Sequence, residues 1–305
     1  MAVSPVRPGF KSGYAAIIGK PNVGKSTLLN QLVETKLAAM SSKPQTTRNR
    51  ITGVVHLPGG QIILLDTPGI HPARSALNQM MVKTSVSTFR DVDVIVFMVD
   101  AQQGFRETDS FVFDSMEKVT APILLALNKI DRASKHDLLS VIAEMDAKKR
   151  FAEIIPISAL HADGLDILSK VILNYLPEGP PYFPEGMITD SPEEFLIAEI
   201  IREKLMNLTR MEIPYASAVK VESVIRRPHA SLRIDAVVYV EKLSQKKIVI
   251  GENASMLKKI GKNAREEIEK RFGDKVYLNL FVKVKSHWSE NLPDLKELGY
   301  THDIH

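Results

Sequence analysis

The segment Gly19-Lys20-Pro21-Asn22-Val23-Gly24-Lys25-Ser26 constrains the fold more than any other part of the chain, because it matches the pattern G-x-x-x-x-G-K-S/T. An apolar run over 14–18 precedes this segment, and residues 27–33 after it have the composition of a helix. In such a strand–loop–helix setting, glycines let the backbone curl around phosphate oxygens, and the helix N-terminus presents partial positive charge. We therefore predict a phosphate-binding loop, in which Lys25 reaches the β- and γ-phosphates and Ser26 binds Mg²⁺. The alternative is a glycine-rich turn before an ordinary helix.

The composition is that of an ordinary water-soluble protein, since 44% of the 305 residues are apolar and 25% are charged. This length suggests about two domains. No apolar run approaches the roughly 18 residues of a membrane span, and we expect no secretory signal because residues 1–12 lack an apolar core. The absence of cysteine excludes disulfides and thiolate metal sites, and it fits a cytoplasmic protein.

The first half of the chain alternates apolar runs with helical patterns as far as about residue 176. Continuous apolar runs such as 92–99 and 122–127 are typical of strands that are buried on both faces. This pattern predicts an α/β domain with a mainly parallel sheet and helices on each side, in which ligands bind at the carboxyl ends of the strands. We expect strands at 14–19, 51–57, 61–66, 93–99, 122–128 and 153–157, and helices near 25–34, 77–90, 107–119, 135–149 and 163–176.

Two further segments suit a magnesium-bound phosphate. Asp66-Thr67-Pro68-Gly69 follows an apolar strand, so Asp66 can hold Mg²⁺ through water and the Gly69 N–H can bind the γ-phosphate. Taken alone, D-x-x-G is usually a turn, but its place about 40 residues after a phosphate loop favours the functional interpretation. Residues 42–48 predict a mobile loop whose threonine completes the Mg²⁺ shell. We favour Thr47 as this ligand, with Thr46 as the alternative.

Asn128-Lys129-Ile130-Asp131, at the end of the strand 122–128, has the chemistry to recognise guanine. The Asp131 carboxylate can accept hydrogen bonds from the ring N1–H and the exocyclic amino group, and adenine offers neither donor there. We expect Asn128 to tie the base site to the phosphate loop and the Lys129 stem to cover the base. Ser158-Ala159-Leu160 follows the next strand, where its backbone N–H groups can meet the guanine O6. An ATPase is the alternative, and it requires that Asp131 does not contact the base.

The second half follows a segment dense in Pro and Gly, 177–186, which cannot extend a helix or enter a sheet interior. Ser191-Pro192-Glu193-Glu194 then predicts a helix start, with Ser191 as N-cap and Glu194 reaching back as in a capping box. The apolar patterns that follow predict strands near 215–226, 231–241 and 276–284 and a long amphipathic helix over about 255–272. We expect domains at 1–178 and 191–290, a linker at 179–190 and a tail at 291–305.

The nucleotide motifs, in this order over roughly 14–160, resemble the five-motif set of GTPases. The amino-acid sequences of these motifs, including Gln45-Thr46-Thr47-Arg48, are similar to those of translation-factor-related GTPases that act on ribosomes and transfer RNA. With the second half, the chain resembles the Era family of bacterial GTPases, which carry a carboxyl-terminal KH domain. The resemblance implies GTP or GDP and Mg²⁺ as cofactors and the hydrolysis of GTP. The implied catalytic residues are Lys25, Thr47 and Gly69, the metal ligands are Ser26, Thr47 and Asp66, and the other nucleotide contacts run from Gly19 to Thr27, from Asp66 to Gly69, and over Asn128, Lys129, Asp131, Ser158, Ala159 and Leu160.

The resemblance also bears on how the attacking water and the developing charge are handled. Related GTPases carry a Gln just after the Asp-x-x-Gly motif to orient the water, whereas this chain has Ile70, which cannot hydrogen-bond. A slow enzyme whose water is positioned otherwise is therefore implied. Asn22 stands where some relatives use an asparagine to help hold K⁺ beside the phosphates, which implies faster hydrolysis in K⁺ than in Na⁺. The alternative for Asn22 is a side chain that stabilises the loop.

The order of elements over about 190–285 resembles a type II KH domain, which clamps about four nucleotides of a single strand with a G-x-x-G loop. Here the loop is Gly251-Glu252-Asn253-Ala254, in which Ala254 is tolerable at a helix start but Glu252 puts negative charge beside a phosphate. Between 242 and 262, six lysines stand against one glutamate, which favours RNA binding over a solvated helix face. The expected RNA-binding residues are Lys246, Lys247, Gly251, Asn253, Lys258, Lys259 and Lys262, and the candidates for the groove floor are Ile248, Ile250, Ile260 and the strand 231–241.

The resemblance implies a role in maturation and assembly of the small ribosomal subunit, with the 3′ end of its 16S ribosomal RNA and the 30S subunit as partners. It also implies a monomer that is cytoplasmic or peripheral on the inner membrane. The alternative is a regulatory GTPase whose KH-like domain binds a protein partner, an alternative that Glu252 keeps open. We expect Trp288 to pack on the KH core, with stacking on a base as the alternative, and we see no metal-binding pattern around His302 and His305.

Overall fold

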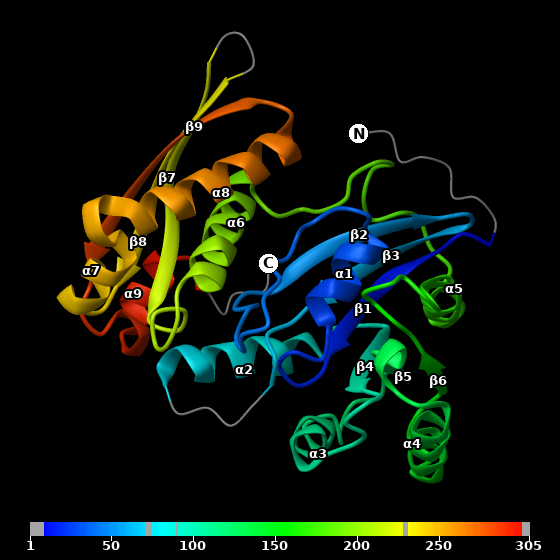
Figure 1. The fold of residues 1–305 in the computed structure, drawn as a ribbon. Helices are drawn as coiled ribbons and strands as arrows, with labels where there is room; N and C mark the ends of the chain where they lie inside the picture. The colour runs from blue at the N-terminus through cyan, green and yellow to red at the C-terminus, as the bar shows by residue number, and fades with distance from the viewer. Residues whose placement is uncertain (1–8, 71–74, 90, 228–230, 301–305) are drawn as a thin grey trace. The chain divides into compact units, whose positions relative to one another are not determined.

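The computed structural model describes residues 9–70, 75–89, 91–227 and 231–300 (Figure 1). They form two compact units. The first runs as far as Asp190, apart from two short segments, and the second holds Ser191 onward together with those segments, 39–46 and 75–80. His302 and His305 lie outside the described residues. Within the described ranges, no helix is both long enough and apolar enough to cross a membrane.

The first unit is built on a six-stranded sheet with the order β2-β3-β1-β4-β5-β6. Its strands are β1 (Lys11–Ile18), β2 (Ile51–Leu57), β3 (Gly60–Asp66), β4 (Val94–Asp100), β5 (Ile123–Asn128) and β6 (Glu153–Pro156). Neighbouring strands are parallel except β2 and β3, which pair antiparallel from Leu57 and Gly60 across a two-residue turn. The predicted mainly parallel sheet is confirmed.

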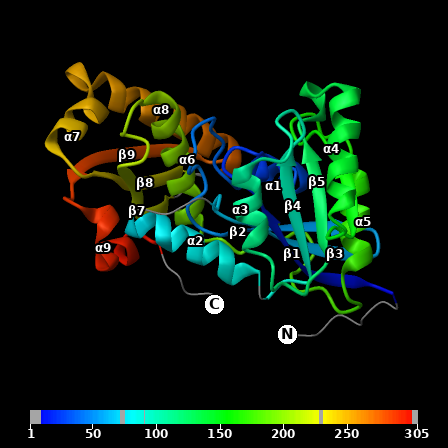
Figure 2. The same ribbon diagram turned by 90° about the horizontal axis from the view of Figure 1, so that it is seen from below.

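Helices cover both faces of this sheet. They are α1 (Lys25–Leu32), α2 (Ala76–Thr88), α3 (Glu107–Asp114), α4 (Lys135–Ala147) and α5 (Leu165–Tyr175). Figure 2 shows α3 and α4 flanking β4 and β5, and their residues Val112 and Met145 belong to one buried cluster with Phe97. α1 and α5 pack closely enough on β2 and β3 that a Cβ added at Gly53 would lie 2.5 Å from Leu29 Cδ1 and one added at Gly60 would lie 2.2 Å from Leu173 Cδ1.

The segment 179–190, which the sequence predicts as a linker, is hydrogen-bonded along the first unit. Val54 N donates to Ile188 O at 2.9 Å, and Thr189 Oγ1 donates to Thr52 O at 2.7 Å, so this part of the segment follows the outer edge of β2. Gln61 Nε2 donates to Phe183 O at 2.8 Å. The segment thereby supplies partners to an edge strand whose backbone groups would otherwise face water.

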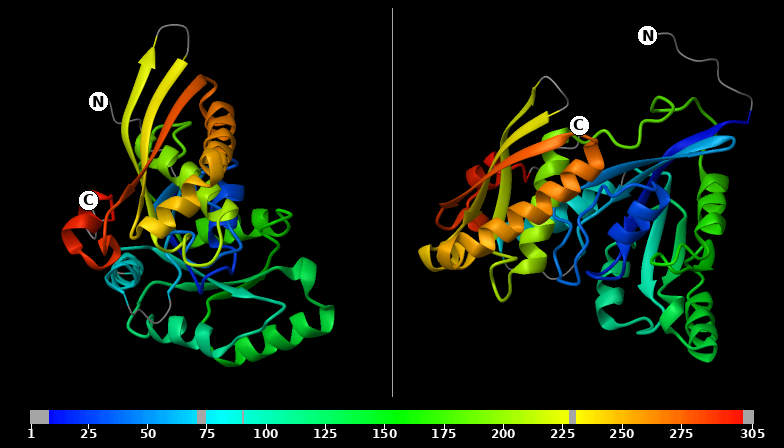
Figure 3. Two further views of the ribbon diagram at one scale, coloured as in Figure 1. Left: turned by 60° about the vertical axis from the view of Figure 1, so that its left-hand side comes forward. Right: turned by 45° about the horizontal axis from the view of Figure 1, so that its top comes forward.

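The second unit is a three-stranded sheet, β7-β8-β9, with its three longer helices on one face and a short last helix against part of the other face. Its elements are α6 (Glu193–Leu208), β7 (Ser217–Arg227), β8 (Ser231–Val240), α7 (Leu243–Ile250), α8 (Ser255–Phe272), β9 (Lys275–Val284) and α9 (Leu292–Glu297). β7 and β8 are antiparallel, whereas β8 and β9 are parallel, and Figure 3 shows the three strands side by side with α8 along them. The predicted order of helix, two strands, two helices and a last strand is confirmed.

The predicted capping box at the start of α6 is wrong by one residue. The helix begins at Glu193, and Pro192 is its N-cap without a side-chain hydrogen bond. Pro192 has a ψ of 148°, which keeps it outside the helix, although a proline is well suited to the first helical position. Glu193 and Glu194 still lie in the first turn, where acidic side chains interact favourably with the helix dipole.

Trp288 lies in the core of the second unit, which confirms the predicted packing and not the alternative of stacking on a base. The side chain is fully buried, its Nε1 donates to Ala216 O at 3.2 Å, and its ring stacks on Tyr300 with 5.8 Å between centroids. A ring that is buried in this way and hydrogen-bonded at its polar atom contributes both apolar burial and a satisfied donor.

We expect Trp288→Ala to lower the free energy of unfolding by about 3–5 kcal/mol, because it leaves a large cavity and an unpaired Ala216 carbonyl. Urea unfolding followed by far-ultraviolet circular dichroism measures the change, since the variant has lost its only tryptophan. A control is Leu292→Ala, whose side chain is 56% exposed and should matter little. A loss of less than about 1 kcal/mol for Trp288→Ala would show that the core does not depend on this ring.

Candidate nucleotide site and nucleic-acid groove

The phosphate loop connects β1 to α1 through backbone conformations that only glycine adopts easily. Gly24 is the N-cap of α1 with a φ of 110°, and a Cβ there would lie 2.2 Å from Asn128 Nδ2. A Cβ on Gly19 would lie 2.7 Å from Met98 O. Because Gly24 has no side chain to cap the helix, the first N–H groups of α1 remain available to an anion.

Lys25 is buried at the base of this loop. Its Nζ donates to the carbonyl oxygens of Gly19 and Lys20, each at 3.1 Å. Burial lowers the pKa of Lys25 to about 8, and the nearby carboxylate of Asp66 opposes that shift. The ammonium group is therefore held by neutral carbonyls in a place where a phosphate would stabilise its charge much better.

Three oxygen donors from separate elements converge beside the loop. Ser26 Oγ lies 2.7 Å from Thr47 Oγ1 and donates to Asp66 Oδ2 at 2.8 Å, and Thr47 Oγ1 lies 3.1 Å from the same carboxylate oxygen. Two hydroxyls and a carboxylate form an all-oxygen set, which is the chemistry that Mg²⁺ requires. Thr46 is directed elsewhere, because its Oγ1 donates to Lys43 O at 2.7 Å. The geometry thus favours Thr47 over Thr46.

The Asp-x-x-Gly segment lies against the phosphate loop. A Cβ on Gly69 would come within 2.9 Å of the backbone nitrogen of Pro21, and Thr67 Oγ1 donates to Ile17 O at 2.9 Å. Pro68 O accepts a hydrogen bond from Ser85 Oγ at 2.8 Å, which ties Pro68 to α2. Ile70 is buried in the apolar cluster under α2 to α4. A buried Ile70 cannot orient a water molecule.

Asn128 joins the phosphate loop to the base-binding segments. Its Nδ2 donates to Val23 O at 2.8 Å, and its Oδ1 accepts from Ala159 N at 2.8 Å. Asp131 accepts a hydrogen bond from Ser158 Oγ at 2.6 Å. That hydrogen bond is the main cause that holds the pKa of Asp131 below its usual value, so the carboxylate is ionised and can accept from guanine. Leu160 is exposed, and Gln31 Nε2 donates to its carbonyl at 3.3 Å.

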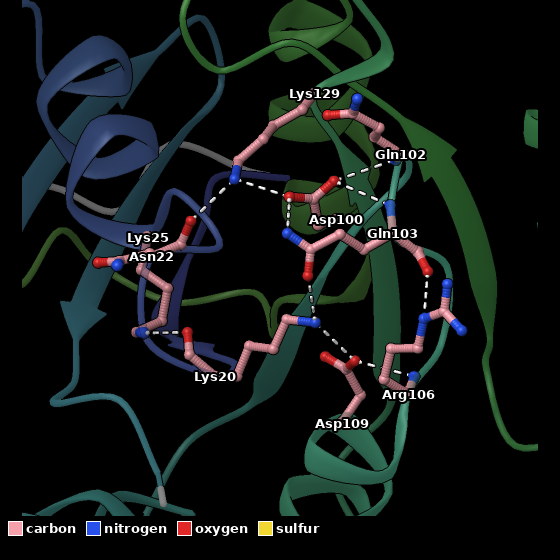
Figure 4. A network of polar contacts seen from close by, with 9 residues as sticks. All are labelled: Lys20, Asn22, Lys25, Asp100, Gln102, Gln103, Arg106, Asp109 and Lys129. Atoms are coloured by element: carbon pink, nitrogen blue, oxygen red, sulfur yellow. Dashed lines mark hydrogen bonds and ion pairs between the residues drawn. The ribbon is translucent and has the colours of Figure 1, made fainter. Parts of the chain in front are cut away.

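A polar network around β4 and α3 was not predicted from the sequence (Figure 4). Lys129 Nζ lies 2.7 Å from Asp100 Oδ2 and donates to Asn22 O at 2.9 Å. Lys20 Nζ lies 2.9 Å from the fully buried Asp109 and 3.2 Å from Gln103 Oε1. Two lysines expected to touch the nucleotide are thus held by carboxylates. Asp100 ends a buried strand, as Asp66 does, and that position was the available signal.

In the second unit, α8 and β9 enclose a groove of about 370 Å³. Its walls carry Lys258, Lys262 and Arg265, and its apolar lining includes Leu257, Leu278 and Leu280. Of the predicted RNA-binding lysines, Lys258 and Lys262 line this groove. Lys246, Lys247 and Lys259 are not among the residues that line it. Arg265 was missed, because it lies outside the lysine cluster and shares the face of α8 only through helical spacing.

The candidates for the groove floor are not among the residues that line this groove. Ile260 is fully buried in the core of the unit, Ile250 packs against that core, and Ile248 is exposed on α7. The strand 231–241 forms β8, the central strand, whereas the groove is lined by the edge strand β9. Apolar spacing alone could not distinguish the face of α8 that enters the core from the adjacent positions that line the groove.

The loop before α8 has the sharp backbone that a G-x-x-G motif needs. Gly251 has a φ of 72°, and a Cβ there would lie 2.8 Å from Met256 Cβ. Asn253 and Ala254 also have positive φ values, of 50° and 59°. Ala254 is the left-handed N-cap of α8 and not a helical residue, so alanine is less well tolerated there than the sequence suggests, at a cost of about 1 kcal/mol. The Glu252 side chain is exposed.

The lowered pKa of Lys25 predicts a pH dependence of nucleotide binding. A bound polyphosphate favours the ammonium form, so above about pH 8 binding must take up a proton. GDP affinity should be constant below that pH and then fall by up to about tenfold per pH unit as the pH rises. Calorimetry in two buffers of different ionisation enthalpy should find proton uptake near about pH 9 and little near about pH 7. An affinity that stays flat across this range would contradict the assignment.

Comparison with known proteins agrees with this geometry. The family model described as "50S ribosome-binding GTPase" matches residues 14–129, and the one described as "KH domain" matches residues 212–289. GTPase Era of Geobacter metallireducens is 50% identical over 96% of this chain and 98% of its own length. GTPase Era of Halothermothrix orenii is 46% identical over 95% of this chain and 99% of its own.

Two solved structures superpose on the chain with a TM-score of 0.93 at 43% identity. One is a tyrosine-to-alanine variant of Aquifex aeolicus Era bound to GDP and AlF4⁻; the match covers 96% of this chain and all of that one. The other is Era in complex with MgGDPNP and nucleotides 1506–1542 of 16S ribosomal RNA, covering 96% of this chain and 99% of that one. From the ordered nucleotide motifs, the KH unit and these full-length similarities, we conclude that the chain is a GTPase and belongs to the Era family.

Proposed function

We propose that this GTPase binds single-stranded ribosomal RNA through the groove of its second unit and acts in maturation and assembly of the small ribosomal subunit. The groove between α8 and β9 carries this proposal, because it combines three cationic side chains with an apolar lining next to a tight glycine loop. Cations neutralise phosphates, and an apolar floor accepts unstacked bases. A relative solved in complex with nucleotides 1506–1542 of 16S ribosomal RNA supports ribosomal RNA as the ligand. The 3′ end of that RNA and the 30S subunit as partners are part of the proposal.

In the nucleotide site, we assign each residue a separate role during GTP hydrolysis. Ser26, Thr47 and Asp66 would hold Mg²⁺, which would neutralise charge on the β- and γ-phosphates. Lys25 would bind those phosphates, the Gly69 N–H would contact the γ-phosphate, and Asp131 would select guanine. A K⁺ ion beside the phosphates, held with the help of Asn22, is also part of the proposal.

Coupling between GTP and RNA is supported by the segment 39–46, which belongs to the same compact unit as α6. Met40 N donates to Glu203 Oε2 at 2.8 Å, and the buried Arg202 donates through Nη2 to Thr46 O. The next residue, Thr47, contributes to the magnesium donor set. A rearrangement of Thr47 upon hydrolysis would therefore displace the adjacent Thr46, whose carbonyl is bonded to Arg202 of α6. In this way the RNA-binding unit could respond to the γ-phosphate.

The base contact is tested by Asp131→Asn. Loss of a charged acceptor for two guanine donors should weaken GTP binding by at least about a hundredfold, while xanthosine triphosphate, which accepts where guanine donates, should bind more tightly. Nucleotide competition against a fluorescent GDP analogue measures both changes. The matched control is Arg132→Gln, because Arg132 lies 3.6 Å from Asp131 on the exposed side and should leave base preference unchanged. An unchanged preference for GTP in Asp131→Asn would show that the carboxylate is misassigned.

RNA binding is tested by reversing the charge of two adjacent lysines, of which only Lys258 lines the groove. Lys258→Glu should weaken binding of a short single strand from the 3′ end of 16S ribosomal RNA by about tenfold or more and reduce the salt slope by about one or more. Lys259→Glu makes the same change in net charge and should have a much smaller effect.

Fluorescence anisotropy at two salt concentrations reads out both variants. Equal effects of Lys258→Glu and Lys259→Glu would indicate a diffuse electrostatic attraction and not a groove. If neither the native protein nor the variants bound RNA at moderate salt, the KH unit would be assigned to a protein partner.

A further inference from the structure

The face of the second sheet opposite α6, α7 and α8 carries exposed aromatic side chains, beyond the end that α9 covers at Lys220 and Tyr239. Along β9, Val276 and Val282 are buried in the core beneath the helices, whereas Tyr277 and Phe281, which point to the opposite face, are 65% and 53% exposed. Ile225, on β7, is also 48% exposed. An open sheet face with large apolar side chains has a binding role more often than scattered single residues do.

The strand register places these side chains in one patch. Arg233 of β8 pairs with Ile225 on one side and with Tyr277 on the other. The next row on this face holds Asp235, whose carboxylate accepts from Ser223 Oγ at 3.0 Å and from Asn279 Nδ2 at 2.7 Å. We call this surface, formed by Ile225, Arg233, Asp235, Tyr277, Asn279 and Phe281, the open-face patch.

The charged side chains named around the patch have a small positive excess. Arg233 is part of the patch, and Lys275 and Lys283 lie at either end of β9 on the same face, both exposed. Asp235 lies 3.4 Å from Arg233 and Glu222 lies 3.5 Å from Lys283, so three cations stand against two carboxylates and Lys275 supplies the excess positive charge. Aromatic rings on a sheet with cations beside them are a platform on which bases of a single strand stack.

The edge position of β9 connects this patch to the groove. Leu278 and Leu280 line the groove, and their immediate neighbours in the strand, Tyr277, Asn279 and Phe281, belong to the patch. No strand lies beyond β9 in the sheet of the described second unit. A nucleic-acid chain that leaves the groove therefore reaches the rings by passing around a single edge strand.

We propose that the open-face patch is a second RNA-binding site, which stacks bases of the same single strand that occupies the groove. Tyr277 and Phe281 are four positions apart along β9, a span of about 13 Å, so the two rings would take different bases. This inference rests on the proposed RNA binding of the groove and extends it to a longer footprint. Lys275 and Lys283, which lie outside the two rings along β9, would bind phosphates on either side of the stacked bases.

The test uses the full-length protein with GDPNP and Mg²⁺ and two RNA probes from the 3′ end of 16S ribosomal RNA. One probe is about four nucleotides long, enough to fill the groove, and the other is about three times that length and extends past both ends of it. The variant is Tyr277→Ser with Phe281→Ser. Both residues are exposed, so the fold should tolerate the change. The conservative variant is Tyr277→Phe with Phe281→Tyr, and the control is Phe111→Ser, an aromatic 45% exposed on α3.

We expect the serine variant to bind the long probe at least about tenfold more weakly and the short probe within about twofold of the native protein. The conservative variant should restore the long-probe affinity, and ultraviolet cross-links from the long probe should map to Tyr277 or Phe281. An unchanged long-probe affinity in the serine variant would overturn the proposal, and so would an equal loss for both probes.

A separate result distinguishes a wrong assignment of the open-face patch from a wrong assignment of the groove. If Lys258→Glu weakens the short probe while the serine variant changes nothing, the groove binds RNA and only the open-face patch is misassigned. A concentration-dependent dimer in sedimentation, abolished by the serine variant without RNA, would assign the patch to a second copy of the chain and would also overturn the proposal.

Discussion

The side-chain amide of Asn128 is the interaction on which the nucleotide site depends. It bonds on one side to the carbonyl of Val23 in the phosphate loop and on the other to the N–H of Ala159 after β6, each at 2.8 Å. One planar group thus fixes the distance between the segment that would bind phosphates and the segment that would bind the base. Because both of its polar ends are satisfied in a buried place, the amide has one favourable orientation.

That interaction requires a glycine at position 24. Its missing side chain is what lets the Asn128 amide approach, since any Cβ would overlap the amide nitrogen. The same residue ends the loop and begins α1, so the packing of the amide also sets where the helix N-terminus points. The network of Lys129, Asp100, Gln103, Lys20 and Asp109 then supports the loop from the side of β4 and α3. Loop, base segment and helix are therefore positioned as one rigid assembly.

The strand ends of the first unit could be predicted from the sequence because buried parallel strands read as continuous apolar runs, and the polar residue that ends each run is easy to see. The motif residues Ser26, Thr47 and Asp66 do converge, as their placement at strand and loop ends implied. The pairing of Lys20 with Asp109 could not be predicted, because it joins residues 89 positions apart through the packing of α3. The spacing of residues within a short segment cannot reveal a contact between residues so far apart in the sequence.

The second unit shows a different limit. The order of its helices and strands was evident from the spacing of apolar residues and from the residues typical of turns. Helix α8 begins and ends where the apolar pattern predicts. The apolar part of the groove lining could not be predicted, because the groove-facing residues Leu257 and Gly261 of α8 are apolar or small, like the core-facing ones beside them. Ile260 enters the core, while Leu257 and Gly261, on either side of it in the sequence, line the groove. Only the packing of β9 against the helix decides between them.

The alternation along β9 has a consequence for how this strand can change. Its even-numbered residues from Val276 to Val284 meet the helices and the groove, while the odd-numbered ones face the other way. A deletion or insertion of one residue would exchange the two sets and bury Tyr277 and Lys283 in place of leucine and valine. Among related proteins, changes in this strand should therefore be substitutions that keep each position on its face. Insertions and deletions should be absent between Lys275 and Val284, even where the loops at both ends vary in length.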